Sequence, residues 1–171
     1  MKTKKELKPG LTFDADGVEM LLLDVSEDGQ VLCITKDLYA ERVVFGDSTE
    51  YEGSNVEKKV KEFEQHMIKC FGAENVLENT VEILTVDGKK AGTYTGKSRL
   101  LTFDEARKYT DLIEDENLPD WWWLMSPWSI PRRRKWGVAC VCPSGFIDSN
   151  DYDYVNGVRP VCILSSFIFN S

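Results

Sequence analysis

The residues of this chain most able to act as nucleophiles or metal ligands are its cysteines and one histidine. The cysteine count is odd and there is no Cys-x-x-Cys pair, so we expect neither a disulfide framework nor a thiolate metal site. His66 is predicted to be a surface residue of a helix, outside any Ser-His-Asp or Cys-His arrangement. We therefore expect no catalytic residues, no cofactor and no enzymatic activity. The cysteines are Cys33, Cys70, Cys140, Cys142 and Cys162.

A basic run, Arg-Arg-Arg-Lys at residues 132–135, stands out in an acidic chain. Planar guanidinium groups in such a run could bind phosphate or an acidic glycan. The same run could equally be a solvated loop. If it is exposed, it would steer an anionic partner toward the protein.

Tryptophans at residues 121–123 and at Trp136 could form an aromatic platform for carbohydrate. Adjacent tryptophans on a short strand more often fill the core and its edge, because each ring buries a large apolar area. We favour the packing role for these four. Trp128 follows Pro127 in a predicted loop, and we expect it to be the exposed tryptophan.

Strands are predicted first in the N-terminal third. Residues 18–25 and 30–36 are apolar or alternating segments joined by a turn at 26–29, a typical hairpin signal. A further extended segment is predicted at 81–86. Three short strands are predicted near the C-terminus, at 137–142, 145–147 and 159–164.

Helices are predicted at two capping boxes, in which a hydroxyl and a carboxylate satisfy each other's free amides. Ser54 opens the first helix, which Gly72 is placed to end. Thr102 opens the second, which is expected to carry Phe103, Ala106, Tyr109 and Ile113. The combination predicts an α+β fold in a single domain spanning 1–171. The buried stripe of the first helix is expected to be Val56, Val60, Phe63, Met67 and Cys70.

Composition restricts the partners. The chain has 171 residues, of which 42% are hydrophobic, and a formal net charge of −8. The negative charge argues against general nucleic-acid binding. No apolar run reaches the ~20 residues of a membrane span. Residues 1–9 are lysine-rich but lack the apolar stretch of a secretory signal, so we expect a chain made in the cytoplasm and not inserted in a membrane.

Two C-terminal motifs resemble those of a known family. Trp121-Trp-Trp-Leu-Met-Ser-Pro127 and Gly157-Val-Arg-Pro160 are similar to motifs of bacterial and phage proteins with a C-type-lectin-like fold, the fold that also houses formylglycine-generating enzymes. The N-terminal hairpin, the Ser54 helix and the Thr102 helix fit that family's pattern more weakly. The chain departs from it at Met125, where the family usually has arginine. The resemblance implies two helices around small antiparallel sheets with a long loop-rich C-terminal segment.

Proteins of that fold include the variable proteins of diversity-generating retroelements, whose binding surfaces are rewritten by mutagenic reverse transcription at adenines. That process does not readily produce Lys, Glu, Gln, Met or Trp. None of these five types occurs in 137–171, and Lys135 is the single Lys, Glu or Gln in 118–171. The resemblance therefore implies a viral or phage receptor-binding protein, associated with a virion or cell surface. Its partner would be a protein or glycan on a cell.

The resemblance divides the chain into a scaffold, residues 1–120, and a C-terminal display segment, residues 121–171. Residues 148–154 have no helical or strand apolar period and are rich in types typical of adaptable binding loops. If Ala139 and Val141 pack inward, as the family pattern implies, the thiols of Cys140 and Cys142 face outward.

The outward-facing residues of the display segment could form most of one protein interface of roughly 20–30 residues a side. The residues expected on the variable ligand-binding surface are Trp128, Ser129, Ile130, Arg132, Arg133, Arg134, Cys140, Cys142, Ser144, Phe146, Asp148, Ser149, Asp151, Tyr152, Asp153 and Tyr154. The residues expected to anchor it as scaffold are Trp122, Trp123, Trp136, Gly137, Gly157, Arg159 and Pro160, of which Arg159 is expected to be buried against an acidic residue or backbone carbonyls.

Two alternatives remain open. A lectin-like module with one fixed glycan specificity would use the exposed aromatics and Asp148, Asp151 and Asp153. Those carboxylates could hold Ca²⁺, but the motifs of calcium-dependent lectins are missing, so we expect no metal site. An enzyme of the formylglycine-generating type would need a particular cysteine pair, which the sequence does not match.

Overall fold

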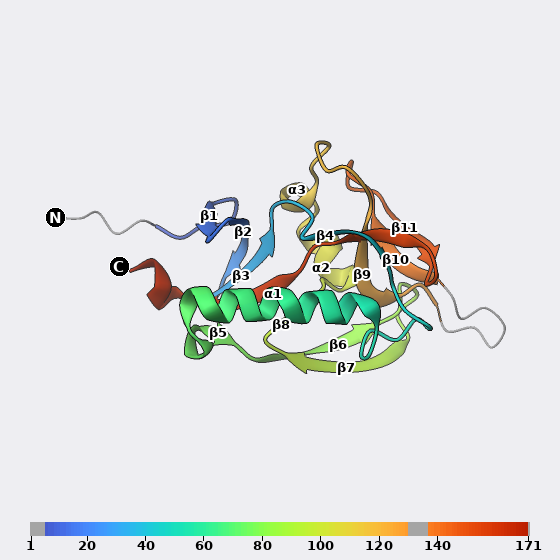
Figure 1. Cartoon of the computed structure of the whole chain (residues 1–171), viewed down its shortest axis with the longest axis horizontal. Coiled ribbons are helices and arrows are strands. Elements are labelled where there is room, and N and C mark those ends of the chain that lie inside the picture. Colours follow the sequence, from blue (N-terminus) through green and yellow to red (C-terminus); the bar gives the residue numbers. More distant parts are fainter. Residues whose placement is uncertain (1–5, 130–136, 171) are drawn as a thin grey trace.

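The computed structural model describes residues 6–129 and 137–170. Within these residues, six strands form a first sheet at the end of the molecule where the first strand and the C-terminal 3-10 helix lie (Figure 1). They are β1 (Thr12–Ala15), β2 (Val18–Val25), β3 (Gln30–Thr35), β5 (Val76–Leu77), β8 (Ser98–Arg99) and β13 (Val161–Ser165), and the 3-10 helix spans Ser166–Phe169. The order across the sheet is β1-β2-β3-β13-β5, and β8 also pairs with β13.

A second sheet lies at the opposite end, ordered β11-β10-β9-β12-β4 (Figure 1). Within this sheet β12 runs parallel to β9, and the other pairings are antiparallel. Two residues, Arg159 and Pro160, separate β12 from β13, so the chain passes directly from the second sheet into the first. The strands are β4 (Ala40–Val44), β9 (Trp122–Pro127), β10 (Gly137–Val141), β11 (Ile147–Asp151) and β12 (Val155–Val158).

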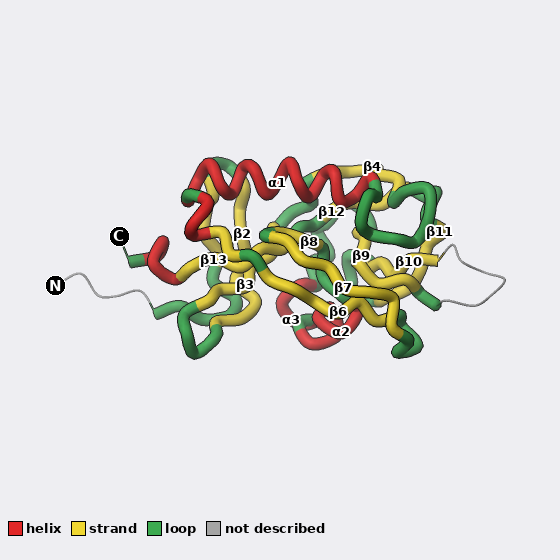
Figure 2. The backbone as a smooth tube through the Cα atoms, turned by 90° about the horizontal axis from the view of Figure 1, so that it is seen from below, coloured by secondary structure: helices red, strands yellow, loops and turns green. Residues whose placement is uncertain are grey.

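Helices and a separate hairpin cover the two sheets. Helix α1 (Asn55–Phe71) runs along the long axis past both of them (Figure 1). In Figure 2 the hairpin of β6 (Asn79–Leu84) and β7 (Lys90–Gly96) crosses the middle of the molecule between α1 and the short helices α2 (Phe103–Lys108) and α3 (Thr110–Ile113). A 3-10 turn (Ala73–Asn75) connects α1 to β5. The long axis is therefore spanned by one helix and by the β12–β13 connection.

Local sequence fixes both ends of α1. The Ser54 Oγ accepts a hydrogen bond from the Glu57 N–H at 3.1 Å, and the Glu57 carboxylate accepts one from the Gly53 N–H at 3.0 Å. At the other end Gly72 has φ 86°, a conformation that favours glycine, and its N–H donates to Ile68 O at 2.8 Å. The buried face of α1 includes Val56, Val60, Phe63 and Met67.

Replacing Ser54 with alanine should lower the free energy of unfolding by about 1 kcal/mol, because the Glu57 N–H loses its acceptor at a largely buried helix start. Urea unfolding followed by circular dichroism measures the change. Gln65→Ala, at an exposed position in the middle of the same helix, is the control and should change stability by less than about 0.5 kcal/mol. Equal midpoints for the two variants would contradict a stabilising cap.

Strand β9 lies at the centre of the packing and is buried on both faces. Trp122 and Leu124 pack into one hydrophobic cluster, together with residues of α2, α3 and the first sheet. Trp123 and Met125 point the other way, into a cluster that contains Phe45 and residues of α1 and β7. Every residue of β9 is buried, so this strand is held from both sides.

The α+β class predicted from the sequence is confirmed, with few helices and several antiparallel or mixed sheets. The hairpin of β2 and β3, the N-cap Ser54 and the capping box at Thr102 are found where they were expected. Cys70 is half-buried, whereas the rest of the predicted stripe of α1 is fully buried.

Three expectations about the elements were wrong. The hairpin partner β7 was missed, because its alternation is interrupted by glycines at residues 92 and 96. The second predicted helix is broken after α2, where Tyr109 has φ −105° and ψ 18°. The strand predicted at 145–147 begins later and becomes β11, so half of the loop-like segment 148–154 is paired with β10.

Within the residues that the structure describes, we find no helix of the length and apolar character needed to cross a membrane.

Candidate functional site

The surface predicted to bind a ligand is built on the hairpin of β10 and β11. Its turn is closed by hydrogen bonds from the Cys142 N–H to Phe146 O and from the Gly145 N–H to Cys142 O, both 2.9 Å long. Gly145 has φ 91°, which the turn requires. Among the described strands, β11 lies at the edge of the second sheet and pairs only with β10. Asp148 and Asp151 on this strand are exposed.

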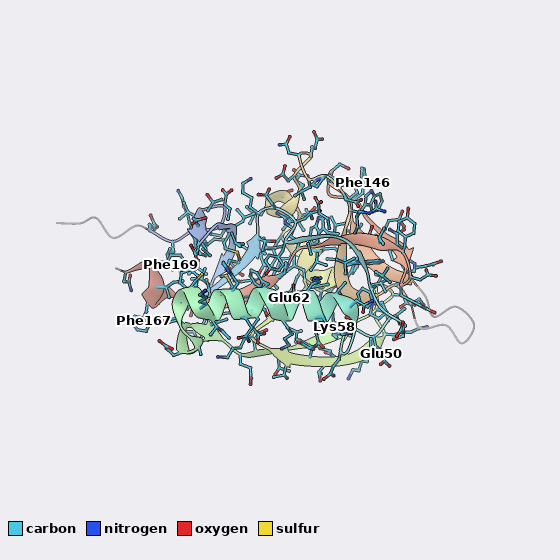
Figure 3. All side chains as sticks on the ribbon, viewed as in Figure 1. Glu50, Lys58, Glu62, Phe146, Phe167 and Phe169 are labelled. Carbon is cyan, nitrogen blue, oxygen red and sulfur yellow. The ribbon has the colours of Figure 1, made fainter. Side chains whose placement is uncertain are left out.

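Aromatic and polar side chains share this surface. Phe146 is 74% exposed, Tyr154 58% and Trp128 37%, so three large rings stand open to solvent. Figure 3 shows Phe146 on the outer side of this end of the molecule, far from Phe167 and Phe169 at the other end. Exposed rings beside polar groups are typical of binding surfaces. Of the predicted surface residues, Ser144, Asp148, Asp151 and Asp153 are also exposed, and Ser129, Ser149 and Tyr152 are half-buried.

Two hollows lie beside the half-buried Trp121. Trp121 and Asp148 line both of them. The larger, of about 680 Å³, lies between Glu116 and the turn that carries Phe146. The smaller, of about 270 Å³, lies between Asp120 and the residues of β11 and β12. The sequence predicted packing for Trp121 and gave no indication of Asp120 or Glu116. These residues belong to the segment that leads into β9, where no periodic pattern marks them.

One of the predicted scaffold residues is a buried arginine. Arg159 is 1% exposed, and its guanidinium donates to Thr35 O at 2.7 Å, to Ile113 O at 2.7 Å and to Lys36 O at 3.0 Å. The guanidinium carbon lies 5.1 Å from the centre of the Trp122 ring. Burial lowers the pKa of Arg159 to about 10, so the group stays charged at neutral pH. The expectation of a buried arginine bonded to carbonyls is confirmed.

Packing is confirmed as the role of Trp122 and Trp123, which are both fully buried. The indole N–H of Trp123 donates to Val43 O at 2.8 Å, which ties β9 to β4 across β12. Gly157 is buried, and its N–H donates to Trp121 O at 2.7 Å. A Cβ atom at Gly157 would lie 2.6 Å from Leu38 Cδ1, so the Leu38 side chain would have to move to admit it. Of the other predicted scaffold residues, Pro160 is buried and Gly137 half-buried.

The expectation that Cys140 and Cys142 face outward was wrong. Cys140 is fully buried and packs with Trp123 and Val138, while Ala139 on the other face of β10 is also buried. The physical reason is that β10 is covered on both faces, so strand alternation does not expose either side. Burial raises the pKa of the Cys140 thiol to about 12, with smaller contributions from Asp148 and Cys142. Cys142 is 7% exposed, and its sulfur lies 3.0 Å from the Ser144 Oγ.

Several predicted residues lie outside the described part of the chain, and the structure gives no placement for them. They are the surface candidates Ile130, Arg132, Arg133 and Arg134 and the scaffold candidate Trp136, together with Lys135 of the basic run.

The structure brings together one Cys–His pair that the sequence reasoning had excluded. On α1 the Cys70 Sγ lies 3.6 Å from the His66 Nε2. The same Nε2 lies 2.6 Å from Ala15 O, and because a carbonyl can only accept, this nitrogen carries the proton and cannot take one from the thiol. Burial, followed by Asp16 and Asp14, raises the pKa of Cys70. The pair is therefore unsuited to nucleophilic catalysis.

A third cleft, of about 440 Å³, opens between β7 and the end of β9. Tyr51 and Tyr94 line it with ring centres 4.8 Å apart, and Met125 and Pro127 contribute from β9. The sequence reasoning missed this cleft, because the strand β7 that forms one wall was not predicted. Among the described residues, no group of three or more His, Cys, Asp or Glu side chains is placed to hold a metal ion.

Comparisons of the chain with known proteins found no matching family model, no matching curated protein and no matching solved structure.

Proposed function

We propose that this chain is a ligand-binding protein of C-type-lectin-like fold, whose C-terminal segment displays a diversified surface on a rigid scaffold. The observation that carries the proposal is the contrast between the central strand and the edge strand of the second sheet. Strand β9 is buried along its whole length, whereas the turn before β11, the edge strand itself and the turn after it present exposed aromatic and acidic side chains. Such a surface can change its side chains without disturbing the core.

Rigidity of the backbone supports a binding role. Arg159 ties the β12–β13 connection to β3 and α3, and the Trp123 indole ties β9 to β4. A surface held in this way loses little conformational entropy when it binds, and more of the interaction energy then appears as affinity. The binding mechanism is complementarity of shape and polarity, with no covalent step.

Composition supports diversification by a retroelement. The exposed positions of the β10–β11 hairpin and the turn after it carry Ser, Phe, Asp and Tyr, types that adenine mutagenesis can produce. Tyr and Ser in particular combine contact area or adaptable hydrogen bonding with a low entropy cost. In this role the protein recognises a protein or glycan on a cell, as a virion- or surface-associated receptor-binding protein.

Deep sequencing of the gene in its source population tests this proposal. We expect amino-acid variation to concentrate at exposed positions such as Phe146, Asp148 and Tyr154, while Trp122 and Arg159 stay fixed. The exposed face of α1, which includes Lys58 and Glu62, serves as the internal control for ordinary sequence drift. If the exposed positions vary no more than α1 does, the diversified surface is wrong.

A lectin-like module with one fixed glycan specificity is the second candidate. The observation in its favour is the pair of hollows beside Trp121, where an aromatic ring, carboxylates and amides lie together. This candidate differs from the first in one measurable respect, because it requires Asp148 and Tyr154 to be invariant in the population.

A further inference from the structure

The smaller hollow beside Trp121 has the features of a built site. Its walls come from three separate segments: Asp120 and Trp121 before β9, residues of β11, and Tyr154 with Asn156 around the start of β12. Its volume of about 270 Å³ lies just below the roughly 300–1,000 Å³ of sites for drug-sized molecules, so it suits a single ring rather than an extended chain.

Asn156 lines this hollow and carries a buried side-chain amide. The residue is 1% exposed and lines the hollow, and its Oδ1 accepts a hydrogen bond from the Asn150 Nδ2 at 3.3 Å. Its own Nδ2 has no hydrogen-bond partner among the described residues. A buried amide left without an acceptor is costly, and most such groups in folded proteins are paired. A ligand in the hollow that offers an oxygen acceptor would satisfy it.

Asp120 and Asp148 supply acceptors to the same hollow. In each residue Oδ1 accepts the N–H of the next residue, Trp121 or Ser149, at 2.8 Å. Within the described part of the chain, the remaining oxygen of each carboxylate makes no hydrogen bond or ion pair. Both oxygens can therefore accept from a ligand, and an anionic ligand would be repelled.

The combination of donors and acceptors selects the ligand chemistry. A cationic side chain would bond to the carboxylates but leave the Asn156 N–H unpaired, whereas a hydroxyl group can donate and accept at once. The rings of Trp121 and Tyr154 offer flat apolar faces beside these groups. We infer that this hollow binds one neutral sugar ring, with hydroxyl groups bonded to Asp120, Asp148 and Asn156. The inference rests on the proposed binding function. It names the glycan chemistry that the side chains present in this chain, as one variant of that surface, recognise at one position.

Saturation-transfer NMR on the whole chain tests the inference with the neutral methyl glycosides of glucose, galactose, mannose and N-acetylglucosamine as probes. We expect at least one of them to bind in the millimolar range. Asp148→Asn replaces an acceptor oxygen with a donor and should weaken that binding by about tenfold or more. Asp104→Asn is the matched control, because Asp104 is exposed on α2, lies outside the predicted binding surface and does not line the hollow; its affinity should stay within about twofold of the parent.

Further arms of the experiment separate the outcomes. Tyr154→Ala should also weaken sugar binding, and addition of a chelator should leave it unchanged, since the carboxylates bond to the sugar directly. The sugar site is wrong if none of the glycosides binds or if Asp148→Asn and Asp104→Asn behave alike. It is also wrong if a chelator abolishes binding, or if arginine methyl ester binds in place of the sugars. Deep sequencing decides separately on the diversified surface, so loss of the sugar site with variable exposed positions would leave the proposed function standing.

Discussion

Replacing Arg159 with leucine is expected to lower the free energy of unfolding by about 4 kcal/mol. Three buried carbonyls, of Thr35, Lys36 and Ile113, would lose their donor, and each unsatisfied group costs roughly 1–3 kcal/mol. The ring of Trp122 would also lose the cation above it. Removing the desolvated charge offsets part of this cost, which keeps the net value below the sum of the separate losses.

Equilibrium unfolding in urea at pH 7 measures this change. Arg107→Leu is the control, because Arg107 is exposed on α2 and should contribute less than about 1 kcal/mol. Arg159→Lys should fall between the parent and the leucine variant, because lysine keeps the charge but lacks the planar fork that reaches three carbonyls. A stability loss below about 1 kcal/mol for Arg159→Leu would show that these carbonyls find other partners, and that Arg159 does not hold the two sheets together.

Elements specified by neighbouring residues were predictable from the sequence. The turn between β2 and β3, the cap at Ser54 and the capping box at Thr102 depend on contacts within a few residues, and the structure shows each of them. Arg159 was expected to be buried, although its partners lie as far away as Thr35. That expectation came from the resemblance of one motif, since no local pattern distinguishes a buried arginine from an exposed one.

Features that depend on distant segments could not be predicted in the same way. Alternation along β10 indicates that the strand has two faces, but it does not show which other segments cover each face. Cys140 was therefore expected to face solvent, whereas it is buried in a cluster that includes the distant residue Phe45. The hollow beside Trp121 was missed for the same reason. Its walls, from Asp120 to Asn156, come together through the parallel pairing of β12 with β9, which leaves no mark on either segment alone.

Glu105→Gln is expected to lower the free energy of unfolding at pH 7 by about 3 kcal/mol. Arg99 is 3% exposed, and its guanidinium makes a paired contact with the Glu105 carboxylate, with N–O distances of 2.6 and 2.9 Å. Removing one partner of a buried ion pair leaves an uncompensated charge, which costs more than the pair contributes. The remaining acceptors of Arg99 are Leu100 O at 3.1 Å and Asn79 Oδ1 at 3.3 Å, so the guanidinium would keep part of its hydrogen bonding.

The cost of Glu105→Gln should also depend on pH. Burial alone would raise the pKa of Glu105, but the hydrogen bonds and charge of Arg99 outweigh it, and the pKa lies below its usual value of 4.5. A carboxyl whose pKa is lower in the folded state contributes its full stabilisation above the unfolded-state pKa and loses it as the pH falls through the folded-state pKa. The stability gap between the parent and Glu105→Gln should therefore be constant from about pH 6 to 8 and shrink below about pH 4.5.

Urea unfolding at a series of pH values measures this gap. Asp104→Asn is the matched control, since it removes a carboxylate from the same helical turn at an exposed position, and it should cost less than about 1 kcal/mol at every pH. A gap that stays unchanged down to about pH 3 would assign the stability to the shape of the Glu105 side chain rather than to its charge. Loss of the gap in acid would instead show that an ion pair holds α2 to β8. Arg159 holds α3 to the first sheet in a similar way, so that buried arginines would fix both short helices.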